Sequence, residues 1–256
     1  MSLELGLIGF PLSHSFSPAY FKQKFAQEGI INRKYSLFEL PELNELTFKE
    51  LIISHPQLCG INVTIPYKQQ IIPLLDEVDE TAAQIGAVNT ITIERKNTKN
   101  FIIKGYNTDI EGIRASFASL FQNEPLPSAA LILGTGGSSR TVAFALRELK
   151  IPFHFVSREK RSTDCLSWDN LNPQFIATCP LIINTTPVGM YPNIDEKPPL
   201  PLESIGNKHF VLDLIYNPDP SLLLQECSIR GAKVLSGKQM LITQAEFSYK
   251  IWQKVF

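Results

Sequence analysis

Short apolar runs alternate with amphipathic stretches along the first hundred residues of the chain. Leu3–Ile8 is predicted to be a strand, and Pro18–Gln27, with Phe21 and Phe25 one turn apart, a helix that Gly29 ends. This alternation of strands with crossover helices is typical of a mainly parallel α/β sheet. Further strands are expected at residues 35–38 and 60–65, and a second helix at residues 42–53.

A new α/β pattern begins after Pro125–Ser128, which is the best candidate for a linker. Before it, two apolar runs flank the polar stretch Arg95–Asn100 and predict a hairpin-like pair of strands, and Asp109 is placed to cap a helix toward Phe121. After it, strand, glycine-rich turn, helix and strand follow one another as in a βαβ unit. Strands are expected before the linker at residues 87–93 and 101–104, and after it at residues 130–133, 153–156, 181–184 and 210–214.

Composition and charge narrow the class of protein. A chain of 256 residues suggests two modest domains of about 150 residues or less, and 44% hydrophobic with 19% charged residues is typical of a globular protein. The net charge of −1, without a basic run, argues against nucleic acid or a membrane surface as partner, so a small molecule is expected. Because the sequence contains neither a long apolar segment nor a recognisable signal peptide, we expect a cytoplasmic location.

The cysteines and histidines follow no pattern of metal ligands or disulfides. The four cysteines are widely spaced, and we expect them to be reduced and mostly buried. The four histidines lack ligand spacing, so no metal is expected. The residues concerned are Cys59, Cys165, Cys179, Cys227, His14, His55, His154 and His209.

A glycine-rich turn lies between the predicted strand 130–133 and the helix that follows it. Gly134, Gly136 and Gly137 match a variant of the G-x-G-x-x-G fingerprint, with Ser139 at the third glycine position. Glycines let the backbone approach a pyrophosphate, and a helix N-terminus offers free N–H donors. The alternative interpretation is a tight turn that binds nothing.

The end of the next predicted strand bears on the type of dinucleotide. An acidic residue there would accept the ribose hydroxyls of NAD, whereas this chain has Ser157 and Arg158, followed by Glu159. A guanidinium pairs well with a 2′-phosphate, so the sequence favours NADP(H). A solvated cluster of surface charges is the alternative.

Two further segments carry polar side chains at predicted strand ends. Gly9–Pro18 places several hydroxyls at a strand-to-helix junction, where they could hold a carboxylate or, more simply, cap the helix through Ser17. Lys68 follows the strand that ends near Pro66, and ligands of open α/β sheets bind beside such ends. A lone lysine is also a common surface residue.

Taken together, eight collinear motifs resemble the shikimate dehydrogenase family from end to end. The resemblance implies NADP-dependent reduction of 3-dehydroshikimate to shikimate in aromatic amino-acid biosynthesis. It implies a substrate domain over residues 1–108 and 238–256, a Rossmann-type dinucleotide domain over residues 109–237, and a cleft between them. The motifs are Gly9–Pro18, Gly60–Lys68, Ile85–Thr90, Gly105–Asp109, Gly134–Arg140, Asn184–Met190, Asp213–Pro218 and Gly237–Ala245.

The resemblance also assigns roles to individual residues. Lys68 and Asp109 would be the catalytic pair, which agrees with the need for a proton donor and a cation beside an oxygen that gains alkoxide character. Ser15 and Ser17 would hold the substrate carboxylate, with Tyr216 as a helper. The other substrate residues would be Asn62, Thr64, Asn89 and Gln244. The cofactor residues would be Gly134, Gly136, Gly137, Ser138, Ser157, Arg158, Thr185, Gly237 and Met240.

Two alternative functions stay open. An NAD-preferring quinate/shikimate dehydrogenase of the same superfamily would differ in cofactor and substrate preference. A catalytically silent sensor could bind shikimate-like ligands with this fold, although ligand binding alone would not require both Lys68 and Asp109. Whether the protein is a monomer or a homodimer is also open.

Overall fold

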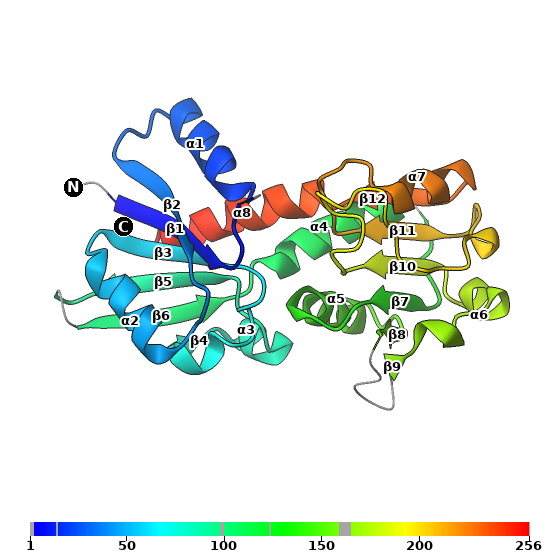
Figure 1. Ribbon diagram of the computed structural model, residues 1–256, viewed down its shortest axis with the longest axis horizontal. Coiled ribbons are helices and arrows are strands. Elements are labelled where there is room, and N and C mark those ends of the chain that lie inside the picture. Colours follow the sequence, from blue (N-terminus) through cyan, green and yellow to red (C-terminus); the bar gives the residue numbers. More distant parts are fainter. Residues whose placement is uncertain (1–2, 14, 98–99, 123, 159–164, 256) are drawn as a thin grey trace. The chain divides into compact units, whose positions relative to one another are not determined.

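The computed structural model describes residues 3–13, 15–97, 100–122, 124–158 and 165–255, and these form two compact units (Figure 1). Unit 1 comprises residues 1–108 and 245–256, and unit 2 comprises residues 109–244. The chain passes from unit 1 to unit 2 after Thr108 and returns to unit 1 at Ala245, which lies within helix α8 (Lys238–Trp252).

The sheet of unit 1 is mixed. Its strands follow the order β2-β1-β3-β5-β6-β4, with β1 pairing parallel to both β2 and β3. The expected hairpin is confirmed, because β5 and β6 pair antiparallel, as do β3 and β5. The strands are β1 (Leu3–Gly9), β2 (Arg33–Glu39), β3 (Leu58–Val63), β4 (Glu77–Val78), β5 (Thr90–Arg95) and β6 (Phe101–Tyr106).

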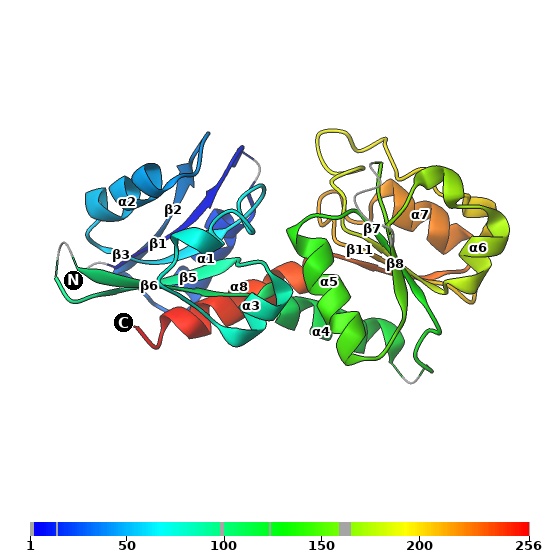
Figure 2. The same ribbon diagram turned by 90° about the horizontal axis from the view of Figure 1, so that it is seen from below.

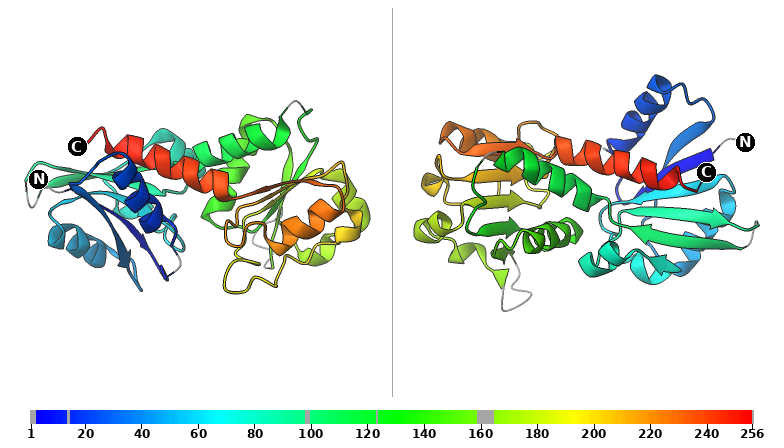
Figure 3. Two further views of the ribbon diagram at one scale, coloured as in Figure 1. Left: turned by 90° about the horizontal axis from the view of Figure 1, so that it is seen from above. Right: turned by 180° about the vertical axis from the view of Figure 1, so that it is seen from behind.

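Helices cover both faces of this sheet (Figures 2 and 3). On one face, α2 packs against apolar side chains of β1, β3 and β5; on the other, α1 and the end of α8 pack around Leu5 and Trp252. Helix α2 begins three residues later than the pattern predicts, because Asn44 caps it with Thr47 in a reciprocal capping box. The helices are α1 (Ser17–Gln27), α2 (Glu45–Ser54) and α3 (Glu80–Ile85), with a 3₁₀ turn at Ile72–Leu74.

The sheet of unit 2 is parallel throughout, in the order β12-β11-β10-β7-β8-β9. All residues of β7, β10 and β11 are buried, as expected for central strands covered on both faces. The predicted α/β class is therefore confirmed. The strands are β7 (Ala130–Leu133), β8 (Phe153–Val156), β9 (Cys165–Leu166), β10 (Leu181–Asn184), β11 (Phe210–Asp213) and β12 (Lys233–Ser236).

The helices of unit 2 cover both faces of its sheet. Helices α6 and α7 contribute to the core on one face, and α4 reaches the other face, where Phe121 contacts Phe210 of β11. Pro125–Ser128 does not separate the two units but joins α4 to β7 inside unit 2. In the described parts of the chain, no helix is both long and apolar enough to cross a membrane. The helices are α4 (Asp109–Phe121), α5 (Gly137–Glu148), α6 (Pro173–Thr178) and α7 (Leu222–Ile229), with 3₁₀ turns at Trp168–Asn170 and Leu202–Ser204.

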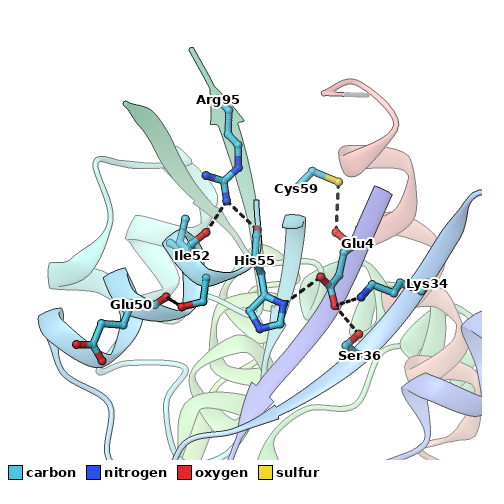
Figure 4. Close-up of polar contacts among 9 residues, drawn as sticks. Glu4, Lys34, Ser36, Glu50, Ile52, His55, Cys59 and Arg95 are labelled. Carbon is cyan, nitrogen blue, oxygen red and sulfur yellow. Dashed lines mark hydrogen bonds and ion pairs between the residues drawn. The ribbon is translucent and has the colours of Figure 1, made fainter. Parts of the chain in front are cut away.

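A buried carboxylate ties β1 of unit 1 to its neighbours (Figure 4). Glu4 is 3% exposed and accepts hydrogen bonds from Ser36 Oγ at 2.6 Å and Lys34 Nζ at 3.0 Å. His55 Nδ1 lies 3.1 Å from the second carboxylate oxygen, an acceptor that favours the tautomer in which Nδ1 is the donor. Arg95 donates to the carbonyls of Ile52 and His55, so the same cluster holds the end of α2.

The Glu4 cluster should make unit 1 sensitive to acid. Burial raises the pKa of Glu4, but the hydrogen bonds from Ser36, Lys34 and His55 outweigh it and leave the pKa below its usual value of 4.5. A lowered folded pKa adds stability above pH 4.5, and this stability is lost as the pH falls through the folded value. We expect Glu4→Gln to cost about 2 kcal/mol of unfolding free energy at neutral pH, less in acid.

Chemical unfolding of the wild type and Glu4→Gln at several pH values checks this expectation. Glu45→Gln is the matched control, because Glu45 is exposed, pairs with Lys49 and lies in the first turn of α2, so its loss should cost much less than the loss of Glu4. Equal stability of Glu4→Gln and the wild type at neutral pH would contradict the argument.

Candidate active site

The predicted substrate residues of unit 1 meet at one edge of its sheet. Parallel strands β1 and β3 end at this edge, and the antiparallel strand β5 begins there, with Asn62 opposite Thr90. Side chains from three separate parts of the sequence therefore converge at this edge. They come from the segment after β1, from the end of β3 and the segment after it, and from the segment before β5. We call this set the polar edge of unit 1: Ser15, Ser17, Asn62, Thr64, Lys68 and Asn89.

Two amides of the polar edge are engaged within the protein. Asn62 is 5% exposed; its Oδ1 accepts from Tyr35 Oη at 2.8 Å, and its Nδ2 donates to the Asn89 carbonyl at 3.1 Å and to Ser248 Oγ at 3.0 Å. Asn89 Oδ1 accepts from the Thr108 N–H at 2.7 Å, and its Nδ2 donates to Thr108 Oγ1 at 3.0 Å. Both side chains thus support the backbone behind the edge.

Three buried hydroxyls complete this network. Thr90 Oγ1 lies 2.7 Å from Ser248 Oγ and 3.0 Å from Thr108 Oγ1, and the latter two are 2.9 Å apart. None of the three was expected from the sequence. These hydroxyls can be recognised only from their common burial behind the polar edge. Because Thr108 directly precedes Asp109, the network also fixes the backbone next to this candidate catalytic residue.

The serines near α1 are not its caps. Helix α1 begins at Ser17, its N-cap residue is Phe16, and no side chain makes a capping hydrogen bond. Ser17 instead hydrogen-bonds Tyr35, whose pKa is raised by burial, so that the phenol stays protonated. Ser15 is half-buried, and its N–H donates to the Leu12 carbonyl at 3.1 Å. The capping alternative for Ser17 is therefore disfavoured.

The two candidate catalytic residues belong to different units. Lys68 is half-buried, and its carbonyl accepts from the Val88 N–H at 2.7 Å, which joins it to the segment that carries Asn89. Asp109 is 3% exposed and is the first residue of α4, where the helix dipole stabilises a carboxylate.

The glycine-rich turn of unit 2 has the geometry of a phosphate-binding turn. Gly134 has a φ of +104°, a conformation that residues with a side chain rarely adopt. A Cβ at this position would also lie only 2.8 Å from Thr185 Oγ1, so both the backbone and the available space require glycine. Gly136 is the N-cap of α5 and supplies no side-chain cap. Ser139 replaces the third glycine and is buried, its hydroxyl donating to the Gly136 carbonyl at 2.6 Å. The start of α5 thus suits an anion such as a pyrophosphate.

The other predicted cofactor residues follow the carboxyl ends of the parallel strands of unit 2. Ser157 and exposed Arg158 follow β8, Thr185 follows β10, and Gly237 follows β12. Residues 159–164, with Glu159 among them, lie outside the described residues. Met240 is buried and would contact a Cβ added to Gly112 of α4 at 2.7 Å. Gln244 Nε2 donates to the Leu241 carbonyl at 2.9 Å, and Tyr216 follows β11.

The cysteines of this protein are free thiols. All four cysteines are free, and burial raises the pKa of Cys59 to about 11 and that of Cys227 to about 12, which keeps both protonated. In the stretches of chain that the structure covers, no group of three or more His, Cys, Asp or Glu side chains could hold a metal ion.

Comparison with known proteins agrees with this geometry. Residues 7–91 match the family model of the shikimate dehydrogenase substrate binding domain. Shikimate dehydrogenase (NADP(+)) of Methanococcus maripaludis is 37% identical over 97% of this chain and 90% of its own length.

Two solved structures are similar over nearly the whole chain. Shikimate 5-dehydrogenase of Thermus thermophilus in complex with NADP(H) and shikimate is 28% identical, with a TM-score of 0.81 over 98% of this chain and 94% of that chain. Quinate dehydrogenase of Corynebacterium glutamicum in complex with NAD is 25% identical, with a TM-score of 0.84 over 99% of this chain and 94% of that chain.

Fold and site together define a two-domain α/β protein of the dinucleotide-dependent dehydrogenase class. The chain belongs to the shikimate dehydrogenase family, as its motifs predicted.

Proposed function

We propose that this protein catalyses the reversible, NADP-dependent reduction of 3-dehydroshikimate to shikimate, a step of aromatic amino-acid biosynthesis. The observation that carries the proposal is Lys68, which follows the carboxyl end of β3 in the segment that matches the substrate binding domain of the family. Incubating the protein with shikimate and NADP+ while following NADPH formation tests it. Failure to form NADPH would overturn it.

The polar edge supplies binding and proton transfer in this reaction. NADPH, when bound, supplies the hydride that reduces the substrate carbonyl. Lys68 donates the proton that the carbonyl oxygen needs as it gains alkoxide character, and its charge stabilises that oxygen beforehand. Asp109 accepts from a substrate hydroxyl. Ser15 and Ser17 donate to the substrate carboxylate.

The remaining residues hold the ring and the cofactor. Thr64 and Gln244 hydrogen-bond the ring hydroxyls and carboxylate, with Tyr216 as a helper, while Asn62 and Asn89 act mainly by holding the backbone behind them. The turn Gly134–Ser138 would hold the cofactor pyrophosphate, and Thr185, Gly237 and Met240 would line the rest of the dinucleotide site.

Cofactor preference follows from Arg158. A guanidinium binds the 2′-phosphate of NADP through charge-assisted hydrogen bonds worth about 1.5–3 kcal/mol, which NAD cannot form. Arg158→Ala should therefore raise the KM for NADP+ about 10- to 100-fold and leave the KM for NAD+ nearly unchanged.

Steady-state kinetics with both cofactors measure this. Arg230→Ala is a suitable control, because Arg230 pairs with Glu226 at the end of α7 and has no proposed role. Equal effects of Arg158→Ala on both cofactors would mean that Arg158 does not meet the 2′-phosphate.

An NAD-dependent quinate/shikimate dehydrogenase is the second candidate, and the similarity to the quinate dehydrogenase bound to NAD favours it. Titrating NADP+ against NAD+, each with shikimate and quinate, distinguishes the two. A cytoplasmic location belongs to the proposal, because four free thiols suit a reducing compartment. The proposed partner is a small molecule, and gel filtration would decide between monomer and homodimer.

A further inference from the structure

The start of α1 is held by contacts from elsewhere in unit 1. Among the described residues, no side chain caps the helix, and its first turn contains no acidic residue. Because most of the stability of a helix in a protein comes from tertiary packing, the place of this turn depends on its neighbours. One neighbour is Tyr35 of β2, which Ser17 contacts. A second is a carboxylate of α8, whose end packs with α1 in unit 1 (Figure 1).

One face of α1 is directed at this carboxylate, which belongs to Glu246. Phe16, Tyr20 and Lys24 are spaced four residues apart and therefore lie along one face of the helix. Tyr20 Oη donates a hydrogen bond to Glu246 Oε1, and Lys24 Nζ lies 2.9 Å from Oε2. The rings of Phe16 and Tyr20 stack, with centroids 5.6 Å apart and planes at 29°. Glu246 is thus connected through Tyr20 to Phe16, which lies between the two serines in the sequence.

The contact between Tyr20 and Glu246 is a charge-assisted hydrogen bond of fixed direction. Burial raises the pKa of Glu246, but the hydrogen bonds from Tyr20 and Lys24 outweigh it and leave the pKa below its usual value of 4.5. The ionised carboxylate has no proton to donate, so the phenol of Tyr20 is the donor. The side chain of Lys24 is 12% exposed, offsets the charge of Glu246 and also pairs with Glu28.

A second phenol of the same helix pair makes a comparable contact farther from the serines. Tyr249 follows Glu246 on α8 by three residues and is 2% exposed, and its Oη accepts a hydrogen bond from Arg33. Its ring packs against Phe25 at 5.9 Å and Phe21 at 6.3 Å between centroids, and both of these side chains are buried in the core. Tyr249 therefore supports the body of α1, whereas Glu246 supports its first turn.

We propose that Tyr20 and Glu246 are positioning residues of the substrate carboxylate site. Glu246 holds the phenol of Tyr20, and the Tyr20 ring in turn holds Phe16. The stacked Phe16 side chain fixes the backbone that carries Ser15 and Ser17. The proposal rests on the carboxylate-binding role proposed above for these two serines. Without the hydroxyl of Tyr20, the ring can turn away from α8, and the serines lose this support.

Tyr20→Phe tests the proposal, because it keeps the ring and removes only the hydroxyl. Calorimetric titration should show shikimate binding weakened about 10-fold, roughly the effect of weakening one hydrogen bond to a charged group. Binding of shikimate methyl ester, which has no carboxylate charge, should change much less. The KM for shikimate should rise more than kcat falls, because the carboxylate is not the reacting group. Wild-type affinity for shikimate, or equal losses for the two ligands, would overturn the proposal.

Tyr249→Phe is the matched control. It makes the same substitution in the same helix pair and removes the hydroxyl that Arg33 contacts, but it leaves the stack of Phe16 and Tyr20 in place. It should lower the melting temperature and leave shikimate affinity near the wild-type value. If Tyr249→Phe weakens shikimate binding as much as Tyr20→Phe does, the contact between the helices is merely structural and the proposal fails.

Glu246→Ala removes the acceptor from the other helix and covers the case in which Tyr20→Phe does not fold, because the Glu246 side chain is 34% exposed. It should reproduce the selective loss of shikimate affinity. It should add little to Tyr20→Phe in the double variant, since both substitutions remove one hydrogen bond. Unchanged shikimate affinity in Glu246→Ala, or fully additive losses in the double variant, would contradict the proposal.

The serines themselves provide the last test. In a variant with both Ser15→Ala and Ser17→Ala, Tyr20→Phe should have no further effect on shikimate affinity, because it acts through those hydroxyls. A further loss of the same size would show that Tyr20 acts elsewhere. A wild type that neither binds nor oxidises shikimate would refute the proposed function itself. An active wild type whose shikimate affinity does not respond to Tyr20→Phe would refute only the positioning role.

Discussion

Replacing Lys68 with alanine should lower turnover at least ~100-fold while affecting substrate binding much less. The ammonium would be lost as proton donor and as the cation beside the developing alkoxide, and both contributions are largest in the transition state. The half-buried position of Lys68, one turn beyond the end of β3, limits the water that could replace it.

Stopped-flow measurement of hydride transfer and calorimetric titration of shikimate separate the two effects. Lys49→Ala serves as the control, because Lys49 is an exposed lysine of α2 paired only with Glu45 one turn away. Near-normal hydride transfer in Lys68→Ala would exclude Lys68 as the proton donor. A loss confined to shikimate affinity would make it a binding residue only.

Removing the hydroxyl of Ser15 or Ser17 should weaken shikimate binding about 10- to 100-fold, because a hydrogen bond to a charged group contributes roughly 1.5–3 kcal/mol. The loss should be specific to ligands that carry a carboxylate. Since α1 has no side-chain cap, these substitutions should not cost the stability that loss of a helix cap would. Ser17→Ala also removes the hydrogen bond to Tyr35 and should have the larger effect on melting temperature of the two.

Shikimate affinity and melting temperature of Ser15→Ala and Ser17→Ala check this prediction. Ser54→Ala is a control for loss of an exposed hydroxyl, since Ser54 bonds only the Glu50 carbonyl of its own helix. A lowered melting temperature with unaltered shikimate affinity would leave the two serines without a role in carboxylate binding.

Local sequence was sufficient to predict elements whose residues are all buried and turns whose backbone conformation requires glycine. The strands β7, β10 and β11 were predictable because fully buried parallel strands are apolar at every position. The turn at Gly134 was predictable because few residues other than glycine adopt its φ. The family, and with it the residues of the polar edge, followed from motifs that are short and local.

Some helices and strands have no recognisable hydrophobic pattern in the sequence, and only the tertiary structure shows them. Helix α7 and strand β12 were not predicted, because α7 is short and apolar on several sides and β12 is an edge strand with no buried residue. The division between the two compact units at Ala245 has no sign in the local sequence, because it falls within the continuous helix α8.

The interior of the site also depends on contacts between distant residues. Asn62, Thr90, Thr108 and Ser248 lie on four separate segments, and nothing in their neighbours along the chain indicates that they hydrogen-bond one another. Asp213 was visible in a motif, but the three donors that surround its carboxylate come together only after folding. The sequence by itself determined which residues can perform the chemistry. Only the tertiary structure decided which polar groups are buried against one another, because burial and hydrogen bonding between distant segments exist only in the folded chain.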